Sequence, residues 1–158
     1  MMKARIRRRV GIVLVLMLPL LFSCRKDARQ DRVCFPGACY EVELALTPET
    51  RQRGLQHRAQ MALDKGMLFV FPVSSAYGFW MKETLIPLDI IWLDQNRRII
   101  HIEEQIPPCE GQPCPVYVPS QPALYVLEIN AGQAAEKRLK TGLKAEFHIS
   151  QKNLNANQ

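Results

Sequence analysis

Three charged side chains stand in stretches of sequence that are otherwise almost wholly apolar, and they are the residues best suited to chemistry. Lys82 and Asp89 lie in the segment 66–94, and Glu128 lies in the segment 123–130. A buried charge is costly unless an opposite charge or hydrogen bonds compensate it. The three groups therefore indicate either paired structural charges or the polar lining of a site.

Both interpretations involve nearby residues of suitable type. In the structural interpretation, arginines of the segment 48–58, or Lys82, pair with the carboxylates and fix the register of the strands. In the functional interpretation, the same groups line a cleft in which Trp80 or Phe79 offers a stacking surface to a small molecule such as a carbohydrate. The candidate ligand-binding or structural charge cluster contains six residues: Arg51, Arg58, Trp80, Lys82, Asp89 and Glu128.

Catalytic motifs are weak in this sequence. No Gly-x-Ser-x-Gly nucleophile motif occurs, and Ser74-Ser75 has no identifiable base. The histidines lack metal-ligand spacing, so a metal site would have to be assembled across strands; neither a metal nor a cofactor is predicted. A binding or accessory module of the cell envelope, without a named reaction, is favoured. The alternative is a hydrolase-like enzyme acting on envelope or polysaccharide material with Asp89, Glu128 and Lys82.

The cysteine spacing indicates two short covalent loops. Apart from Cys24, the chain has Cys34 and Cys39, then Cys109 and Cys114, with the same spacing in both pairs. Proline and glycine within each pair suit a tight turn that brings two thiols together. Four cysteines allow three connectivities, and a four-thiolate zinc site is the sharper alternative. We favour two local disulfide bridges, as expected in an oxidising compartment.

The first 23 residues have the parts of a secretion signal: a basic start, an apolar run from Val10 to Phe22, and a small residue, Ser23. The apolar run is shorter than the ~20 residues that span a bilayer. Residues 21–24 also resemble a bacterial lipobox, which predicts acylation of Cys24 and a lipid anchor on the periplasmic side of a membrane. Residues 24–32 would form a polar tether. Ordinary secretory cleavage, giving a soluble periplasmic protein, is the alternative.

The basic character of the chain belongs mainly to this leader. Five of the 21 Lys and Arg residues precede Gly11, and the other 16 are matched by 15 Asp and Glu residues. Beyond the leader, no basic stripe with interleaved aromatic residues is evident. Nucleic acid is therefore not expected as a partner.

The apolar patterns describe the elements that must position the charged cluster. Alternating or continuous apolar runs predict strands over 40–47, 67–71, 78–83, 88–94, 98–106, 123–130 and 144–150. Thr47-Pro48-Glu49 indicates a helix start, and a second short helix is expected over 133–140. Because no βαβ rhythm is seen, we predict a mainly β, single antiparallel β-sandwich or barrel-like domain over 33–150, followed by a polar tail over 151–158.

Four motifs are specific enough to be compared with known families. The first is Arg51-Gln-Arg-Gly-Leu55, followed by Arg58, and the second is Gly66 to Phe71. The third is Phe79-Trp-Met-Lys82, followed by Thr84 and by Pro87-Leu-Asp-Ile90. The fourth is Tyr125-Val-Leu-Glu128, followed by Ala131-Gly132. Together they resemble the domain-of-unknown-function 192 family. The resemblance implies a compact jelly-roll-like β-sandwich, often exported, with no established reaction, and it supports pairing of Cys109 with Cys114. Two positions depart from the family pattern: Glu83 replaces asparagine, and Gln56 replaces a hydrophobic residue.

Overall fold

The computed structural model describes residues 30–150 and Asn153. The predicted leader, the lipidation residue Cys24, most of the tether and most of the tail lie outside the described residues. Among the residues that are described, no helix is long and apolar enough to cross a membrane.

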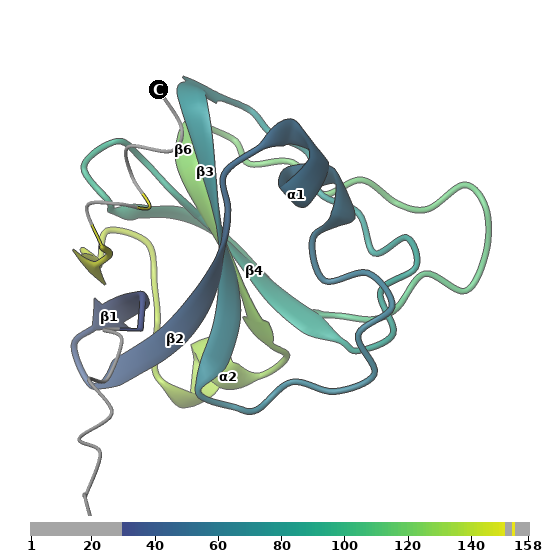
Figure 1. The fold of residues 1–158 in the computed structure, drawn as a ribbon, viewed down its shortest axis with the longest axis horizontal. Coiled ribbons are helices and arrows are strands. Elements are labelled where there is room, and N and C mark those ends of the chain that lie inside the picture. The colour runs from purple at the N-terminus through teal and green to yellow at the C-terminus, as the bar shows by residue number, and fades with distance from the viewer. Residues whose placement is uncertain (1–29, 151–152, 154–158) are drawn as a thin grey trace, which may run out of the picture.

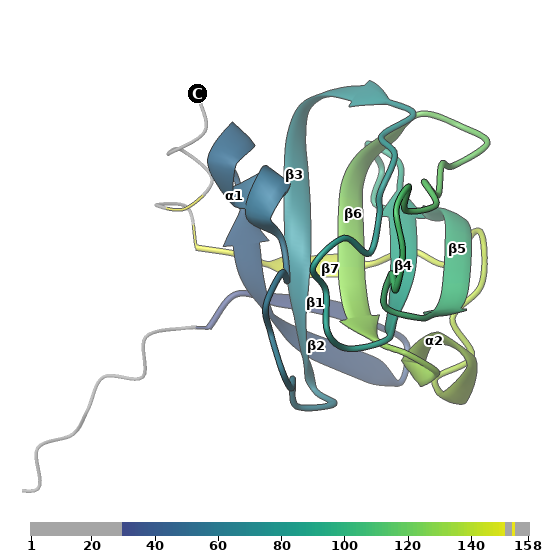
Figure 2. The ribbon, with the colours of Figure 1, turned by 90° about the vertical axis from the view of Figure 1, so that its right-hand side faces the viewer.

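Seven strands form one curled sheet, and two short helices lie at its margins (Figures 1 and 2). The strands are β1 (Arg32–Phe35), β2 (Ala38–Ala45), β3 (Lys65–Ser75), β4 (Leu88–Leu93), β5 (Ile99–Ile106), β6 (Ala123–Asn130) and β7 (Glu146–His148). The helices are α1 (Pro48–Arg53) and α2 (Gln133–Glu136). The strand order is β5-β4-β6-β3-β2-β1-β7. The predicted mainly β fold is confirmed, but the strands form one sheet in place of the two stacked sheets of a sandwich.

The first hairpin contains a strand that the sequence patterns did not predict. β1 pairs with β2 across the turn Pro36-Gly37, and Gly37 has a φ of 84°, which glycine adopts without steric cost. Cys34 lies directly opposite Cys39, and the two are bonded. The structure also joins Cys109 to Cys114, so both predicted local pairs are formed.

One pair of neighbouring strands is parallel, so the expectation of a wholly antiparallel arrangement is wrong. β2 and β3 run in the same direction, and residues 46–64, which include α1, make the crossover between them. The helix start was predicted correctly: the Thr47 hydroxyl accepts from the Thr50 N–H at 3.3 Å, and Pro48 opens the helix. Because α1 buries no residue, it has no apolar periodicity that could reveal a βαβ unit.

The segment 78–83, predicted as a strand, is a loop. Its single ladder contact joins Phe79 to Tyr117, with both N–H···O distances at 2.8 Å, and ties it to the loop 107–122. β3 instead continues through residues 72–75, which were expected to be a loop. Pro72 is tolerated there because β2 pairs with β3 only as far as Phe69, which leaves one side of the strand without a partner.

Each face of the curled sheet carries its own hydrophobic cluster. The inner cluster lies within the curl and includes Val33, Tyr40, Leu68, Ile91, Ile99, Leu127 and Ala145. The outer cluster includes Leu55, Phe69, Met81, Ile90, Trp92 and Val126. In Figure 1, α1 and the loops 76–87 and 107–122 lie on one side of the sheet, and β1 and β7 lie on the other. The two loops and α1 therefore cover the outer face, where the candidate site is found.

Candidate functional site

A cleft of about 240 Å³ opens between α1, the loop 76–87 and the outer face of the sheet. The residues that line it are Arg51, Gln52, Arg53, Leu55, Gln56, Phe69, Phe71, Tyr77, Gly78, Phe79, Trp80, Lys82, Thr84 and Glu128. The extent to which these residues are buried distinguishes the base of the cleft from its mouth. Leu55, Phe69, Thr84 and Glu128 are buried at the base, whereas Arg53, Trp80 and Lys82 are exposed at the mouth.

Interlocked aromatic rings form one wall of the cleft. The rings of Phe71 and Tyr77 stack with centroids 3.5 Å apart, and Phe79 meets Phe69 edge to face at 4.9 Å. Phe79 also contacts the buried Trp92, whose indole N–H donates to the Tyr77 carbonyl oxygen at 3.0 Å. The loop 76–87 is thereby held against the sheet, and the wall is rigid before any molecule enters.

Glu128 forms the base of the cleft and has no compensating partner. Cross-strand pairing places it between Met67 of β3 and Ile90 of β4, and it is only 5% exposed. Its Oε2 atom is buried without a hydrogen-bond partner among the described residues. A glycine, Gly66, lets β3 approach this point, because a Cβ there would lie 2.5 Å from the Glu128 carbonyl oxygen. Unpaired buried polar atoms are rare in native proteins and demand a specific explanation.

Burial raises the pKa of Glu128 to about 8, because the charged form is removed from water. No salt bridge to Glu128 is formed within the described part of the chain. At neutral pH the side chain is therefore mainly a neutral carboxylic acid, which can donate one hydrogen bond as well as accept.

Arg51 lines the cleft but is held by the fold. Its Nη1 atom donates to the carbonyl oxygens of Leu46 and Val70, the latter at 2.9 Å, and its guanidinium lies 5.3 Å from the centroid of the Phe71 ring. These contacts fix α1 against β3. Arg51 is therefore a structural cation that shapes the wall, and it does not pair with Glu128 as the ion-pair interpretation expected.

Asp89 does not belong to the cleft, which corrects its place in the predicted cluster. Ile90 is the cross-strand partner of Glu128, so Asp89, one residue earlier, points to the opposite face of the sheet. It is fully buried and accepts backbone N–H groups from Gln105 at 2.8 Å, Gly132 at 3.0 Å and Ala134 at 2.7 Å. Asp89 of β4 thus adds a side-chain link to the neighbouring strand β5 and holds the start of α2 to the sheet, and it cannot form a carboxylate pair with Glu128.

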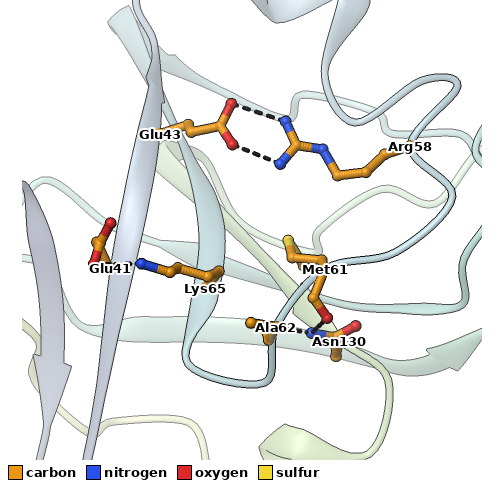
Figure 3. A network of polar contacts seen from close by, with 7 residues as sticks. All are labelled: Glu41, Glu43, Arg58, Met61, Ala62, Lys65 and Asn130. Atoms are coloured by element: carbon orange, nitrogen blue, oxygen red, sulfur yellow. Dashed lines mark hydrogen bonds and ion pairs between the residues drawn. The ribbon is translucent and has the colours of Figure 1, made fainter.

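Arg58 also lies elsewhere, in a second hollow that we call the ionic groove. Its lining residues are Glu41, Val42, Glu43, Arg58, Gln60, Met61, Ala62, Lys65 and Gly66. Figure 3 shows the polar contacts of Arg58 and Lys65 in this groove. Two N–H groups of Arg58 donate to the Glu43 carboxylate at 2.6 and 2.9 Å, and Glu43 raises the pKa of Arg58. Lys65 pairs with Glu41. The charges of this groove are already neutralised by one another, so it offers a ligand little that is unsatisfied.

In the region that the structure describes, the histidines do not come together with other side chains into a metal site. His57 lies 3.7 Å from Glu83, His101 pairs with Glu103 at 2.9 Å, and within residues 30–150 no group of three or more His, Cys, Asp or Glu side chains could hold a metal ion. Besides Phe79, the lining residues that lay outside the predicted cluster are Gln52, Arg53, Leu55, Gln56, Phe69, Phe71, Tyr77, Gly78 and Thr84. The only signal for them was their position inside or beside the compared motifs.

Glu83 occupies a backbone conformation that suits asparagine better. Its φ is 58°, in the left-handed region, and its carbonyl oxygen accepts the His57 N–H at 2.7 Å. Asparagine adopts this region more readily than glutamate. We expect Glu83→Asn to raise the free energy of unfolding by about 0.5–1 kcal/mol, because the exposed contact with His57 contributes little.

A thermal melt checks this expectation, with a rise in Tm of about 2–4 °C for Glu83→Asn. Glu110→Asn is the matched control, since Glu110 is exposed and is not among the residues with positive φ. A Tm that stays constant or falls in Glu83→Asn would show that the conformation at this position is not strained.

Comparison with known proteins gives a family and two related crystal structures. Residues 32–147 match the profile of domain of unknown function 192, described as "Uncharacterized ACR". A protein of unknown function from Novosphingobium aromaticivorans DSM 12444 is 33% identical, with a TM-score of 0.67 over 74% of this chain and 83% of that chain. A protein from Sinorhizobium meliloti 1021, described as a "putative transcription regulator", is 33% identical, with a TM-score of 0.68 over 75% of this chain and 92% of that chain. No curated protein matches the chain.

Proposed function

Because the chain belongs to the domain-of-unknown-function 192 family, whose description names no reaction, we propose its function from the cleft itself: the protein is a binding module that holds a small molecule between the aromatic wall and Glu128. The proposal depends on the residues of this chain alone.

The contrast between two buried carboxyl groups carries the proposal. Asp89 and Glu128 are similarly buried, yet Asp89 accepts three backbone N–H groups and Glu128 has a buried oxygen without a partner. Asp89 shows how this fold supplies hydrogen-bond donors to a buried carboxylate whose role is structural. Glu128 lacks such partners and lines a cleft, so a bound molecule is the natural source of its missing hydrogen bond.

The cleft sets limits on that molecule. Its volume of about 240 Å³ lies below the usual ~300–1,000 Å³ of pockets for drug-sized molecules, so a single ring with a short polar substituent is a suitable size. The faces of Phe79 and Trp80 suit the flat side of an aromatic ring or of a sugar. Glu128 is the one carboxylate among the lining residues, so the geometry favours binding over hydrolysis by a carboxylate pair.

Tryptophan fluorescence tests the proposal, because the chain has only two tryptophans. Trp80 is 49% exposed at the mouth of the cleft, whereas Trp92 is fully buried. Titration with benzylamine, benzyl alcohol, benzoate and methyl glucoside should change the Trp80 emission with at least one probe, in a saturable way. In Trp80→Phe, which retains only Trp92, the same probe should leave the emission nearly unchanged. No response to any of the four at millimolar concentration would count against the cleft as a site.

We also propose that this module is exported and attached to the periplasmic face of a bacterial membrane through Cys24. The support is the lipobox-like sequence at residues 21–24 and the two cystine loops, which suit an oxidising compartment. A lipid anchor would hold the binding cleft near envelope material.

Fractionation of cells that express Cys24→Ser tests the anchor. The unchanged protein is expected in the membrane fraction and the variant in the soluble periplasmic fraction, because a serine cannot receive the thioether-linked lipid. Cys109→Ser serves as the control for cysteine loss and should stay with the membrane. A Cys24→Ser protein that remains fully membrane-bound would refute acylation at this residue.

A further inference from the structure

Resting on the proposed function, we infer that the molecule bound in the cleft carries a primary ammonium group, which enters first and donates its hydrogen bonds to Glu128. The body of the molecule then lies along the aromatic wall. The base of the cleft has a carboxyl oxygen without a partner in the described region, and its aromatic wall already contacts one cation.

The base of the cleft lacks a cation. Glu128 has a buried, unpaired Oε2 atom, and none of the lining cations pairs with it. Arg51 donates to two carbonyl oxygens, while Arg53 and Lys82 are exposed at the mouth of the cleft. A carboxylate in a desolvated site gains most from a charged donor, since such hydrogen bonds are about twice as strong as neutral ones. An ammonium group is compact enough to reach this point.

The wall of the cleft already accepts one cation on an aromatic face. The guanidinium of Arg51 lies 5.3 Å from the centroid of Phe71, within the range of a cation–π contact. Phe69 and Phe79 present further ring surface in the same lining. A second cation inside the cleft would be held by aromatic faces around it and by the carboxylate beneath it, which is how proteins recognise organic ammonium groups.

The positive charges at the mouth of the cleft repel an entering ammonium group only weakly. Arg53 and Lys82 stand in water, where the field of an exposed charge is screened within about 8–10 Å at physiological salt. Glu128 acts at close range in a site from which water is excluded, so its attraction dominates at the base. The mouth could, in addition, accept an anionic substituent at the outer end of the molecule.

Binding of an ammonium group should release a proton. Burial raises the pKa of Glu128 to about 8, so near neutral pH the group must ionise before it can pair with a cation. The other charged or titratable residues in the lining are Arg51, Arg53, Tyr77 and Lys82. His57 and His101 lie outside the lining. The affinity for an ammonium ligand should therefore rise between pH 6 and pH 8 because Glu128 ionises.

Calorimetry with three probes of similar shape and different charge tests the inference: benzylamine, benzyl alcohol and benzoate. At pH 8 we expect benzylamine, as its ammonium ion, to bind at least about tenfold more tightly than benzyl alcohol. Its affinity should fall by more than about tenfold from pH 8 to pH 6. The preference should disappear in Glu128→Gln, which keeps the shape of the side chain, and persist in Glu43→Gln, which removes a carboxylate of the ionic groove.

Each other outcome has a distinct meaning. If benzyl alcohol binds as tightly as benzylamine, or benzoate binds most tightly, the ammonium inference is wrong while the cleft remains a binding site. If none of the three binds, the ammonium inference is wrong; if methyl glucoside also leaves the Trp80 emission unchanged, the proposed function fails together with it. An affinity for benzylamine that is the same at pH 6 and pH 8 would also overturn the pairing with Glu128, whatever the behaviour of the Gln variant.

Discussion

Asp89→Asn is expected to lower the free energy of unfolding by about 3 kcal/mol. The carboxylate of Asp89 is fully buried and accepts three backbone N–H groups, from Gln105 of β5 and from Gly132 and Ala134 at the start of α2. Asparagine keeps one oxygen but turns an amide NH₂ toward a backbone donor. The variant therefore loses charge-assisted hydrogen bonds and leaves a buried N–H without an acceptor.

Urea unfolding measures this loss. Asp64→Asn is the matched control, because Asp64 is exposed, and we expect its free energy of unfolding to change by less than about 0.5 kcal/mol. The slope of the urea transition should stay the same in both variants, since the fold is retained. A loss below about 1 kcal/mol in Asp89→Asn would show that these three contacts contribute little to the attachment of α2 and to the link between β4 and β5.

Glu128→Gln is expected to raise the free energy of unfolding, the opposite of Asp89→Asn, and to do so only as the pH rises. The folded-state pKa of Glu128 is raised to about 8 from an ordinary value of 4.5, so between these values the folded protein binds more protons than the unfolded chain. The stability that the neutral side chain provides is fully present below pH 4.5 and is lost as the pH rises through about 8. Glutamine stays neutral, so its advantage should grow across this window by on the order of 5 kcal/mol.

Free energies of unfolding at pH 4.5, 6.5 and 8.5 test this sign. The difference between Glu128→Gln and the unchanged protein should increase at each step, whereas Glu104→Gln, on an exposed carboxylate of β5, should show no such trend. A constant difference would mean that Glu128 titrates alike in the folded and unfolded protein. The cleft would then lack the desolvated base on which the proposed function depends.

The sequence predicted much of the architecture where the signals are local. The strands β4 and β5, the helix start at Thr47 and the two short cystine loops all depend on residues close together in the chain, and all are present. The parallel pairing of β2 and β3 was missed because its crossover helix buries no residue. The loop 78–83 was misread as a strand because Phe79, Trp80 and Met81 have high β propensity, although they serve here to cover the sheet.

The candidate site was only partly predictable for a different reason. Arg51, Trp80, Lys82 and Glu128 do meet in one cleft, but Asp89 and Arg58 do not. The separation of Asp89 from Glu128 depends on the register of β4 against β6, where a shift of one residue would exchange the faces. Register between strands far apart in the chain is set by tertiary packing, so composition and alternation alone could not reveal it.

The position of a bound probe tests the central claim most directly. In a protein-observed NMR titration with benzylamine at pH 8, we predict that the largest shifts of backbone amide signals fall on Phe79, Thr84 and Glu128, which line the cleft. The signals of Gln60 and Ala62, in the ionic groove, should move little. Shifts concentrated in the groove, or small and uniform over the domain, would contradict the assignment of the aromatic cleft as the binding site.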